Sequence, residues 1–330
     1  MKPKTAEFNC YKLANPTLLS RPTDIPDDYI AYNPSAIWTD RRKSGRASDV
    51  IYVRVEPDRS CPGSSHLGKS VVRPYTIDVN NFNKPLEPYY DAPEIVGEDA
   101  ALTKIKRRLA SGTFEIIWLL SCIHVKPSKT RPDQVESLHT KFFAGTNLDK
   151  LEHIANGPVG MKDIRIAQNP NSIGLHIYGR PQPEAFSGNI TYATVSSIDR
   201  LNAKAISDAK FIDEDLFPVG SGIWGGANDV ICAKGGNNTI LAHRAWCTGE
   251  NGVGRHYESL LLNHDTRNNT IRNLGILATA SLFPEGTTKA DEAVDLHDVV
   301  FSGGGYNGTL NHVSFGVRDG SIGLSSTHRH

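Results

Sequence analysis

The sequence predicts an all-β protein, a five-bladed β-propeller with its site in a funnel on the axis. Polar residues that each lead into a short apolar strand recur 64 to 69 residues apart, at Asn33, Asp99, Asp163, Asp229 and Asp298. A period of this size is typical of a repeat architecture, and propellers have four to eight blades. Five units of roughly 66 residues fill the 330-residue chain, so we expect one domain over residues 1–330.

The first three units each contain short β-rich runs separated by Gly, Asn and Pro. The first unit has an alternating run at 51–56, and the second has an apolar run at 114–120. The third has two runs, at 173–178 and 190–195. Enrichment in β-branched and aromatic residues between turn formers predicts strands rather than helices.

The last two units predict hairpins. In the fourth, residues 230–233 lead into a Gly-Asn turn at 234–238, and the chain resumes as a strand at 239–243. In the fifth, the strand at 299–301 is expected to break at the glycine run 302–305. Residues 59–69, rich in Ser, Gly and Pro, are expected to form a surface loop.

Charge and composition exclude several classes of partner. The chain has 36 Lys and Arg against 36 Asp and Glu, which gives no basic field for nucleic acid or a membrane surface. The amino terminus lacks the apolar core of a signal peptide, and the longest apolar run, 116–125, is too short to span a bilayer. Five scattered cysteines without a CxxC pair indicate neither a disulfide framework nor a zinc site. We therefore expect a cytoplasmic protein with a small-molecule partner.

Asp99 is the candidate catalytic acid because it lies at the mouth of a buried strand. The five polar starts should converge near the axis, which makes Asp163 and Asp298 further candidates for substrate contacts. Asn33 and Arg54 fall on the inner hairpin of the first unit. The ordinary alternative for a charged residue in an alternating strand is a solvent-facing side chain.

A basic cluster in the third unit is a candidate anion site. Lys162, Arg165 and Arg180 alternate toward one place, where forked guanidinium donors and an ammonium group suit a phosphate. Surface solvation is the alternative. His243 and Tyr257 in the fourth unit lie where they can join the cluster, although a lone histidine is more often structural.

Two further features suit a sugar. Trp224, beside two glycines, could stack on a sugar ring or instead fill the space between two blades. Asp319, like Asp298, could hold sugar hydroxyls or brace a turn.

A family resemblance rests on several motifs taken together. They are Tyr32-Asn33-Pro34-Ser35, Arg54-Val55-Glu56, Glu98-Asp99, Lys162-Asp163-Ile164-Arg165, Gly179-Arg180-Pro181, His243 and Phe315-Gly316-Val317-Arg318-Asp319. In order and spacing they resemble the mannoside phosphorylases of glycoside hydrolase family 130. With Trp224-Gly225-Gly226-Ala227-Asn228 and Asp298-Val299-Val300-Phe301 they resemble still more the β-1,2-mannosyltransferase/phosphorylases of kinetoplastid parasites, glycosyltransferase family 108.

The resemblance implies a five-bladed propeller and a single catalytic acid, at Asp99. It implies that the mannosyl unit is held by Asn33, Ser35, Arg54 and Asp319. It also implies that phosphate is bound by Lys162, Arg165, Arg180, His243 and Tyr257. The implied substrates are mannose oligosaccharides with phosphate, mannose 1-phosphate or GDP-mannose.

The chemistry that follows is inverting transfer of a mannosyl group. Phosphate is already an anion, so it needs no general base, whereas a hydrolase needs two carboxylates. No metal or cofactor is expected, since no dinucleotide or ATP-binding glycine motif is present. Two alternatives stay open: an inverting hydrolase, and a non-catalytic propeller that binds carbohydrate.

Overall fold

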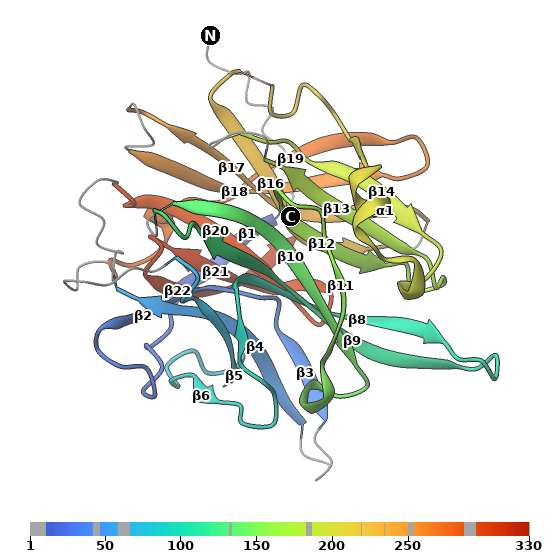
Figure 1. Cartoon of the computed structure of the whole chain (residues 1–330). Helices are drawn as coiled ribbons and strands as arrows, with labels where there is room; N and C mark the ends of the chain where they lie inside the picture. The colour runs from blue at the N-terminus through green and yellow to red at the C-terminus, as the bar shows by residue number, and fades with distance from the viewer. Residues whose placement is uncertain are drawn as a thin grey trace.

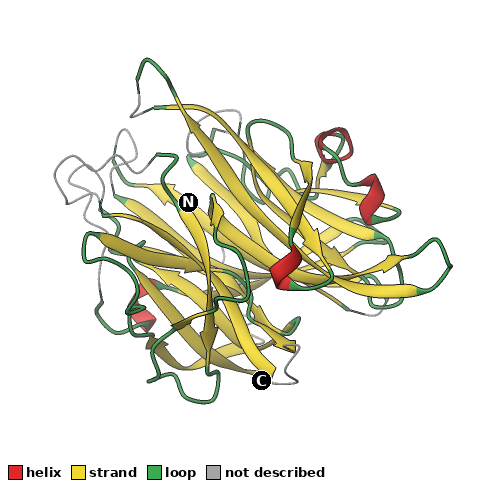
Figure 2. Ribbon diagram, turned by 60° about the horizontal axis from the view of Figure 1, so that its bottom comes forward, coloured by secondary structure: helices red, strands yellow, loops and turns green. Residues whose placement is uncertain are grey.

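The computed structural model describes residues 11–41, 47–58, 67–131, 134–182, 187–218, 220–233, 235–249, 254–286 and 295–329. Within these ranges most of the regular secondary structure is strand, which confirms the all-β prediction (Figure 2). The helical segments are short: α1 (Ala203–Ser207) and the 3-10 turns η1 (Leu148–Lys150), η2 (Ile198–Arg200) and η4 (Ala280–Leu282). None of them has the length and hydropathy of a membrane span. The amino terminus and most of the expected loop at 59–69 lie outside the described residues.

The strands form antiparallel groups that follow the chain (Figure 1). The first group is a six-stranded sheet of β2 (Tyr29–Pro34), β3 (Trp38–Arg41), β4 (Ala47–Pro57), β5 (Val71–Ile77), β6 (Glu87–Pro88) and β7 (Ile95–Val96). The second is a four-stranded sheet of β8 (Glu98–Arg108), β9 (Phe114–Pro127), β10 (Val135–Gly145) and β11 (Glu152–Asn156). The third, also four-stranded, has β12 (Met161–Gln168), β13 (Leu175–Pro181), β14 (Thr191–Val195) and β15 (Lys210–Phe211).

The remaining strands share one eight-stranded sheet that contains two further groups. The fourth group is β16 (Ile223–Cys232), β17 (Asn237–Cys247), β18 (Arg255–Asp265) and β19 (Thr270–Ala278). The fifth is β20 (Asp298–Tyr306), β21 (Thr309–Val317) and β22 (Ser321–Arg329), with β1 (Tyr11–Leu18) paired to β22. The two groups meet where β18 and β20 pair in parallel over His256–Asp298 and Tyr257–Val299. The first and the last of the described strands thus belong to the same group.

The first strand of each group carries a β-bulge, and this is the physical basis of the period in the sequence. In the first three groups the irregularity falls at Asn33, Asp99 and Asp163, each with a left-handed backbone (φ 45°, 49° and 51°). Asn and Asp tolerate this conformation better than other non-glycine residues. In the fourth and fifth groups the extra residue is Asn228 and Gly303. The predicted positions Asp229 and Asp298 are therefore one and five residues away from the bulges.

The glycine run 302–305 is inside a strand, and the predicted break there is wrong. Strand β20 continues through it to Tyr306, and the chain turns at 307–308 before β21. A side chain at Gly303 would collide with the backbone carbonyl of Pro34, and one at Gly304 would lie 2.7 Å from the Cα of Ala36. The glycines therefore permit close approach of the first group, which is a common reason for glycine in a strand.

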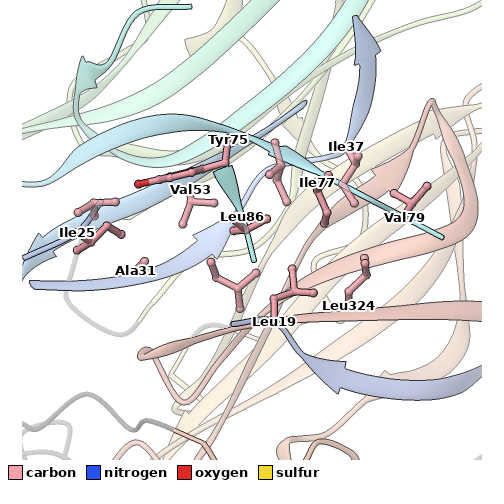
Figure 3. Packing of buried hydrophobic residues seen from close by; sticks show 13 residues of the cluster. Leu19, Ile25, Ala31, Ile37, Val53, Tyr75, Ile77, Val79, Leu86 and Leu324 are labelled. Carbon is pink, nitrogen blue, oxygen red and sulfur yellow. The ribbon is translucent and has the colours of Figure 1, made fainter. Parts of the chain in front are cut away.

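Hydrophobic clusters join each group to the next. In the described residues, one cluster joins the first and second groups through Tyr52 and Leu102, and others join the second to the third, the third to the fourth and the fourth to the fifth. Another joins the first group to the fifth, where Val53 and Tyr75 pack in one cluster with Leu324 of β22 (Figure 3). Burial of apolar surface between neighbours is what holds the groups together.

Candidate active site

A cavity of about 350 Å³ lies where the bulged strands meet, and every group contributes to its wall. Nine of the thirteen candidate site residues line it: Asn33, Arg54, Asp99, Lys162, Asp163, Arg180, His243, Tyr257 and Asp319. The bulges explain how neighbours such as Lys162 and Asp163 both reach it. Successive side chains of a regular strand point to opposite faces, and a bulge interrupts that alternation.

Asp99 is fixed by two donors from the first group. Its Oδ1 accepts hydrogen bonds from Asn33 Nδ2 at 3.0 Å and from Arg54 Nη1 at 3.3 Å. No other hydrogen bond of this carboxylate occurs among the described residues, which leaves Oδ2 as the oxygen that can exchange a proton. Asp99 can thus act as an acid or a base from a fixed position.

Arg54 is buried, and its guanidinium pairs with carboxylates rather than with solvent. Its Nε and Nη2 donate to Glu56 Oε2 at 2.9 and 2.5 Å, and Nη2 lies 3.0 Å from Glu98 Oε1. Glu56 is completely buried and also accepts from Tyr32 Oη at 2.7 Å and Ser70 Oγ at 2.6 Å. Arg54 is therefore held rigidly beside Asp99.

A second buried ion pair also lines the cavity. Arg180 Nε donates to Asp163 Oδ2 at 2.5 Å, and its Nη1 donates to the carbonyl of Ser187 at 3.0 Å. Burial alone would raise the pKa of Asp163, but the charges of Arg180, His243 and Arg165 hold that pKa well below its usual range. Asp163 is thus a permanent anion that keeps Arg180 in place.

His243 presents an unsatisfied nitrogen beside this pair. Its Nδ1 hydrogen-bonds Asn228 Oδ1 at 2.7 Å, and its Nε2 is buried with no hydrogen-bond partner in the described part of the chain. Asp163 Oδ2 lies 4.0 Å from this Nε2. The ring stacks on Tyr257, with centroids 5.6 Å apart, and burial raises the pKa of Tyr257 to about 12, so that its hydroxyl stays a donor. Lys162, Arg180 and Tyr257 offer donors to an anion in the cavity. The neutral His243 donates from Nδ1 to Asn228, so its Nε2 can accept from a protonated oxygen of that anion.

Burial lowers the pKa of His243 from 6.5 to about 4 despite the opposing effect of Asp163. The unfolded chain therefore binds a proton at higher pH than the folded protein does, so stability falls as the pH drops from about 6.5 toward 4. The full loss is about 3 kcal/mol at 1.36 kcal/mol per pKa unit. We expect His243→Gln to remove this contribution, as measured by urea unfolding across that pH range. Equal pH slopes for variant and wild type would contradict the buried neutral state.

Four candidates, Ser35, Arg165, Trp224 and Asp298, do not line the cavity. Ser35 is buried, with Oγ donating to the carbonyl of Ala36 at 2.8 Å and accepting from the amide of Tyr52 at 3.0 Å. Arg165 donates to the carbonyl of Asn228 at 2.6 Å, behind the anion site.

The other two candidates, Trp224 and Asp298, make packing and surface contacts, which the sequence had left open as alternatives. Trp224 is buried and packs edge-on against Tyr257, with centroids 5.9 Å apart, so it supports a lining residue. Asp298 has a side chain 67% exposed and an ion pair with His256 at 3.0 Å. Asp298 does not line the cavity.

The sequence interpretation missed several lining residues. Tyr32, Glu98, Arg255 and Phe301 line the cavity, as do the apolar side chains Leu67, Val125, Val135, Leu138 and Val299. Glu98 directly precedes Asp99, and Arg255 lies two residues before Tyr257. Their closeness to these candidates in the sequence could have identified them as lining residues. The apolar residues carry no such signal. No group of His, Cys, Asp and Glu in the described residues is arranged to hold a metal ion.

Comparison with known proteins places the chain among β proteins of one fold. A family model described as "Protein of unknown function (DUF1861)" matches residues 114–319, and a search of curated proteins finds no match. The structure of MPT-4, a mannose phosphorylase from Leishmania mexicana in complex with phosphate ion, is similar at TM-score 0.74 and 22% identity, over 96% of this chain and 88% of that one. MPT-1, a GDP-Man-dependent mannosyltransferase from the same organism, matches at 0.72 and 22%, over 96% and 90%.

A more distant likeness is to a structure from the glycoside hydrolase family 130 of mannoside phosphorylases, described with hydrolases that target β-1,2-mannosidic linkages in Candida mannan. It matches at TM-score 0.55 and 11% identity, over 91% of this chain and 84% of that one. At these identities the likeness shows a shared fold, and the resemblance stated from the sequence is confirmed at that level.

Proposed function

We propose that this chain, which belongs to the family described as "Protein of unknown function (DUF1861)", is an inverting β-mannoside phosphorylase and mannosyltransferase. Its substrates would be β-1,2-linked mannose oligosaccharides, with phosphate, mannose 1-phosphate or GDP-mannose at the anion site. The observation that carries the proposal is that one cavity is lined by Asp99, a carboxylate held through Oδ1 alone among the described residues, and by a separate cluster of Lys162, Arg180 and His243. A phosphorolytic enzyme needs this combination.

The fold that we propose is a single five-bladed propeller domain with the cavity on its axis. Each of the five groups would be one blade, since each contributes an inner strand with a bulge. The hydrophobic clusters support closure, because they join every group to the next and also the first to the fifth. Pairing of β1 with β22 would fasten the ring, which removes exposed sheet edges.

The proposed reaction follows from these positions. Asn33, Arg54 and Asp319 hold the mannosyl unit, and the basic cluster places phosphate on the face opposite the leaving sugar. A phosphate oxygen forms a bond to the anomeric carbon while the glycosidic bond breaks. Asp99 supplies the proton for the leaving oxygen through a sugar hydroxyl, so a β-mannoside gives α-mannose 1-phosphate. In the reverse direction Asp99 takes the proton back.

The anion side argues against the hydrolase. An inverting hydrolase needs a carboxylate base that activates water on the face opposite the acid. Asp163 is the lining carboxylate that lies beside Arg180 and His243, and it is paired with Arg180 at 2.5 Å with its pKa held low. A carboxylate so strongly stabilised as an anion is a weak base, whereas phosphate needs none.

Incubation with β-1,2-mannobiose and phosphate tests the proposal directly. We expect mannose and mannose 1-phosphate in equal amounts, at a rate that rises with phosphate concentration until it saturates. Mannose released at the same rate without phosphate would favour the hydrolase. Binding of mannobiose with no product under either condition would favour the non-catalytic propeller.

A further inference from the structure

One wall of the anion site offers an acceptor instead of a donor. The Nδ1 atom of His243 lies 2.7 Å from the side-chain oxygen of Asn228. An amide oxygen only accepts hydrogen bonds, so Nδ1 carries the hydrogen and Nε2 of the neutral ring carries a lone pair. This Nε2 is buried, has no hydrogen-bond partner among the described residues, and belongs to a residue that lines the cavity.

Asn228 is held so that its side-chain oxygen faces the imidazole. Its Nδ2 donates to Ser302 Oγ at 2.9 Å, and its backbone carbonyl accepts from Arg165 Nε at 2.6 Å. Asn228 is 1% exposed, so no solvent competes for these contacts. The network therefore fixes which nitrogen of His243 carries the hydrogen, which is the usual way in which a protein sets a histidine tautomer.

The groups around His243 keep its ring neutral. Tyr257 of β18 stacks on the ring, and Phe301 of β20 packs against it at 5.4 Å between centroids. Asp163 Oδ2 lies 4.0 Å from Nε2, which is too far for a hydrogen bond. Burial lowers the pKa of His243 to about 4. Of the charged groups that act on it, Asp163 of β12 and Asp99 of β8 oppose this shift, while Arg180 of β13 and Arg165 of β12 add to it.

We propose that His243 makes the anion site selective for a phosphate that carries a proton. Its Nε2 accepts from a P–OH group, while Lys162, Arg180 and Tyr257 donate to the other oxygens. A buried acceptor that receives no hydrogen bond costs free energy, so a ligand that brings the missing donor is favoured. The selection rests on the proposed function and narrows its substrates.

The proton stays on the phosphate during the proposed reaction. The hydrogen phosphate dianion attacks through an unprotonated oxygen, the bond from that oxygen to the anomeric carbon forms as the glycosidic bond breaks, and Asp99 supplies the proton for the leaving oxygen. The product is the monoanion of mannose 1-phosphate, with its P–OH group still on His243. The reverse reaction must therefore take up this monoanion.

This requirement separates the mannosyl donors. Mannose 1-phosphate has a P–OH group below its second pKa of about 6 and loses it above that pH. In GDP-mannose the phosphate next to mannose is esterified on both sides and has no P–OH group near neutral pH. The site therefore favours phosphate and mannose 1-phosphate over a nucleotide-linked donor.

Calorimetric binding of inorganic phosphate and of sulfate tests the selection. Sulfate has a similar tetrahedral shape and two negative charges, but it has no proton at neutral pH. We expect it to bind at least about 10²-fold more weakly, because a site that bonds a ligand hydroxyl rejects an analogue without it. The affinity for mannose 1-phosphate should fall about tenfold per unit above pH 6, whereas the affinity for inorganic phosphate should change much less.

His243→Gln should remove the selection, because the amide can turn its NH2 group toward the anion. Phosphate and sulfate should then bind within about tenfold of each other, and the pH dependence for mannose 1-phosphate should flatten. His256→Gln is the matched control on the neighbouring strand. His256 pairs with Asp298 outside the cavity, so this variant should keep the wild-type ratio of the two affinities.

Equal binding of phosphate and sulfate by the wild type would overturn the inference, and this measurement does not depend on a variant that folds. Mannose 1-phosphate affinity that stays constant from pH 6 to pH 8 would overturn it as well. Binding is measured without turnover, so selectivity in a protein that performs no phosphorolysis would contradict the proposed function alone. Phosphorolysis that sulfate inhibits with an affinity equal to that of phosphate would contradict the selection alone.

Discussion

Replacement of Asp99 by asparagine should slow phosphorolysis of a β-1,2-mannoside by about 10² to 10⁴, which is the usual contribution of a positioned general acid. Asparagine keeps an oxygen for the hydrogen bonds from Asn33 and Arg54 but has no proton to transfer. It also accepts the left-handed backbone (φ 49°) of this position, as Asn33 does at the equivalent bulge. We therefore expect normal unfolding curves and nearly normal binding of mannobiose, measured by calorimetry, with a loss confined to kcat.

Asp298→Asn is the matched control for this experiment. It makes the same chemical change in a carboxylate that is exposed and outside the cavity, where its ion pair with His256 contributes little. We expect its kcat to equal that of the wild type. Retention of near-normal phosphorolysis by a folded Asp99→Asn, with or without a defect in Asp298→Asn, would show that Asp99 is not the acid.

The repeat period could be recognised in the sequence because it has a structural cause. The sequence located the bulge of each inner strand only to within a few residues. Polar residues repeat because each inner strand needs a left-handed or bulged residue, and Asn33, Asp99 and Asp163 meet that need directly. In the fourth group the bulge residue is Asn228, and the neighbouring Asp229 instead accepts the amide of Gly305 at 2.9 Å. The position of a bulge depends on how the strand pairs with its neighbour, and this register cannot be derived from a single sequence.

The same bulges explain which of the predicted site residues line the cavity. Arg165 follows Asp163 by two residues, and simple alternation would put both on the cavity side. The register shift between Lys162 and Arg165 breaks that alternation, so Arg165 faces Asn228 of the next group instead. Glu98 was missed for the converse reason, since alternation would turn it away from Asp99.

Arg180→Ala should be the most destabilising single change in the anion site. It leaves Asp163 buried, with an exposed fraction of 3%, and without the partner that lies 2.5 Å away. Removal of one member of a buried ion pair costs about 3–5 kcal/mol, mostly because the remaining charge is uncompensated. We expect a loss of this size in the free energy of unfolding, measured with urea, together with a higher phosphate requirement in whatever activity the folded fraction retains.

Arg244→Ala is the control, because Arg244 pairs with Glu258 at the same 2.5 Å but with side chains 29% and 18% exposed. Its loss should be about 1 kcal/mol or less, as is usual for pairs near solvent. Asp163→Asn in the Arg180→Ala background should recover much of the stability, since it removes the stranded charge, but it should not recover phosphate binding, since the guanidinium is still missing. If the double variant regained both, Arg180 would serve only to neutralise Asp163, and the anion would have to be held by Lys162 and Tyr257 without it.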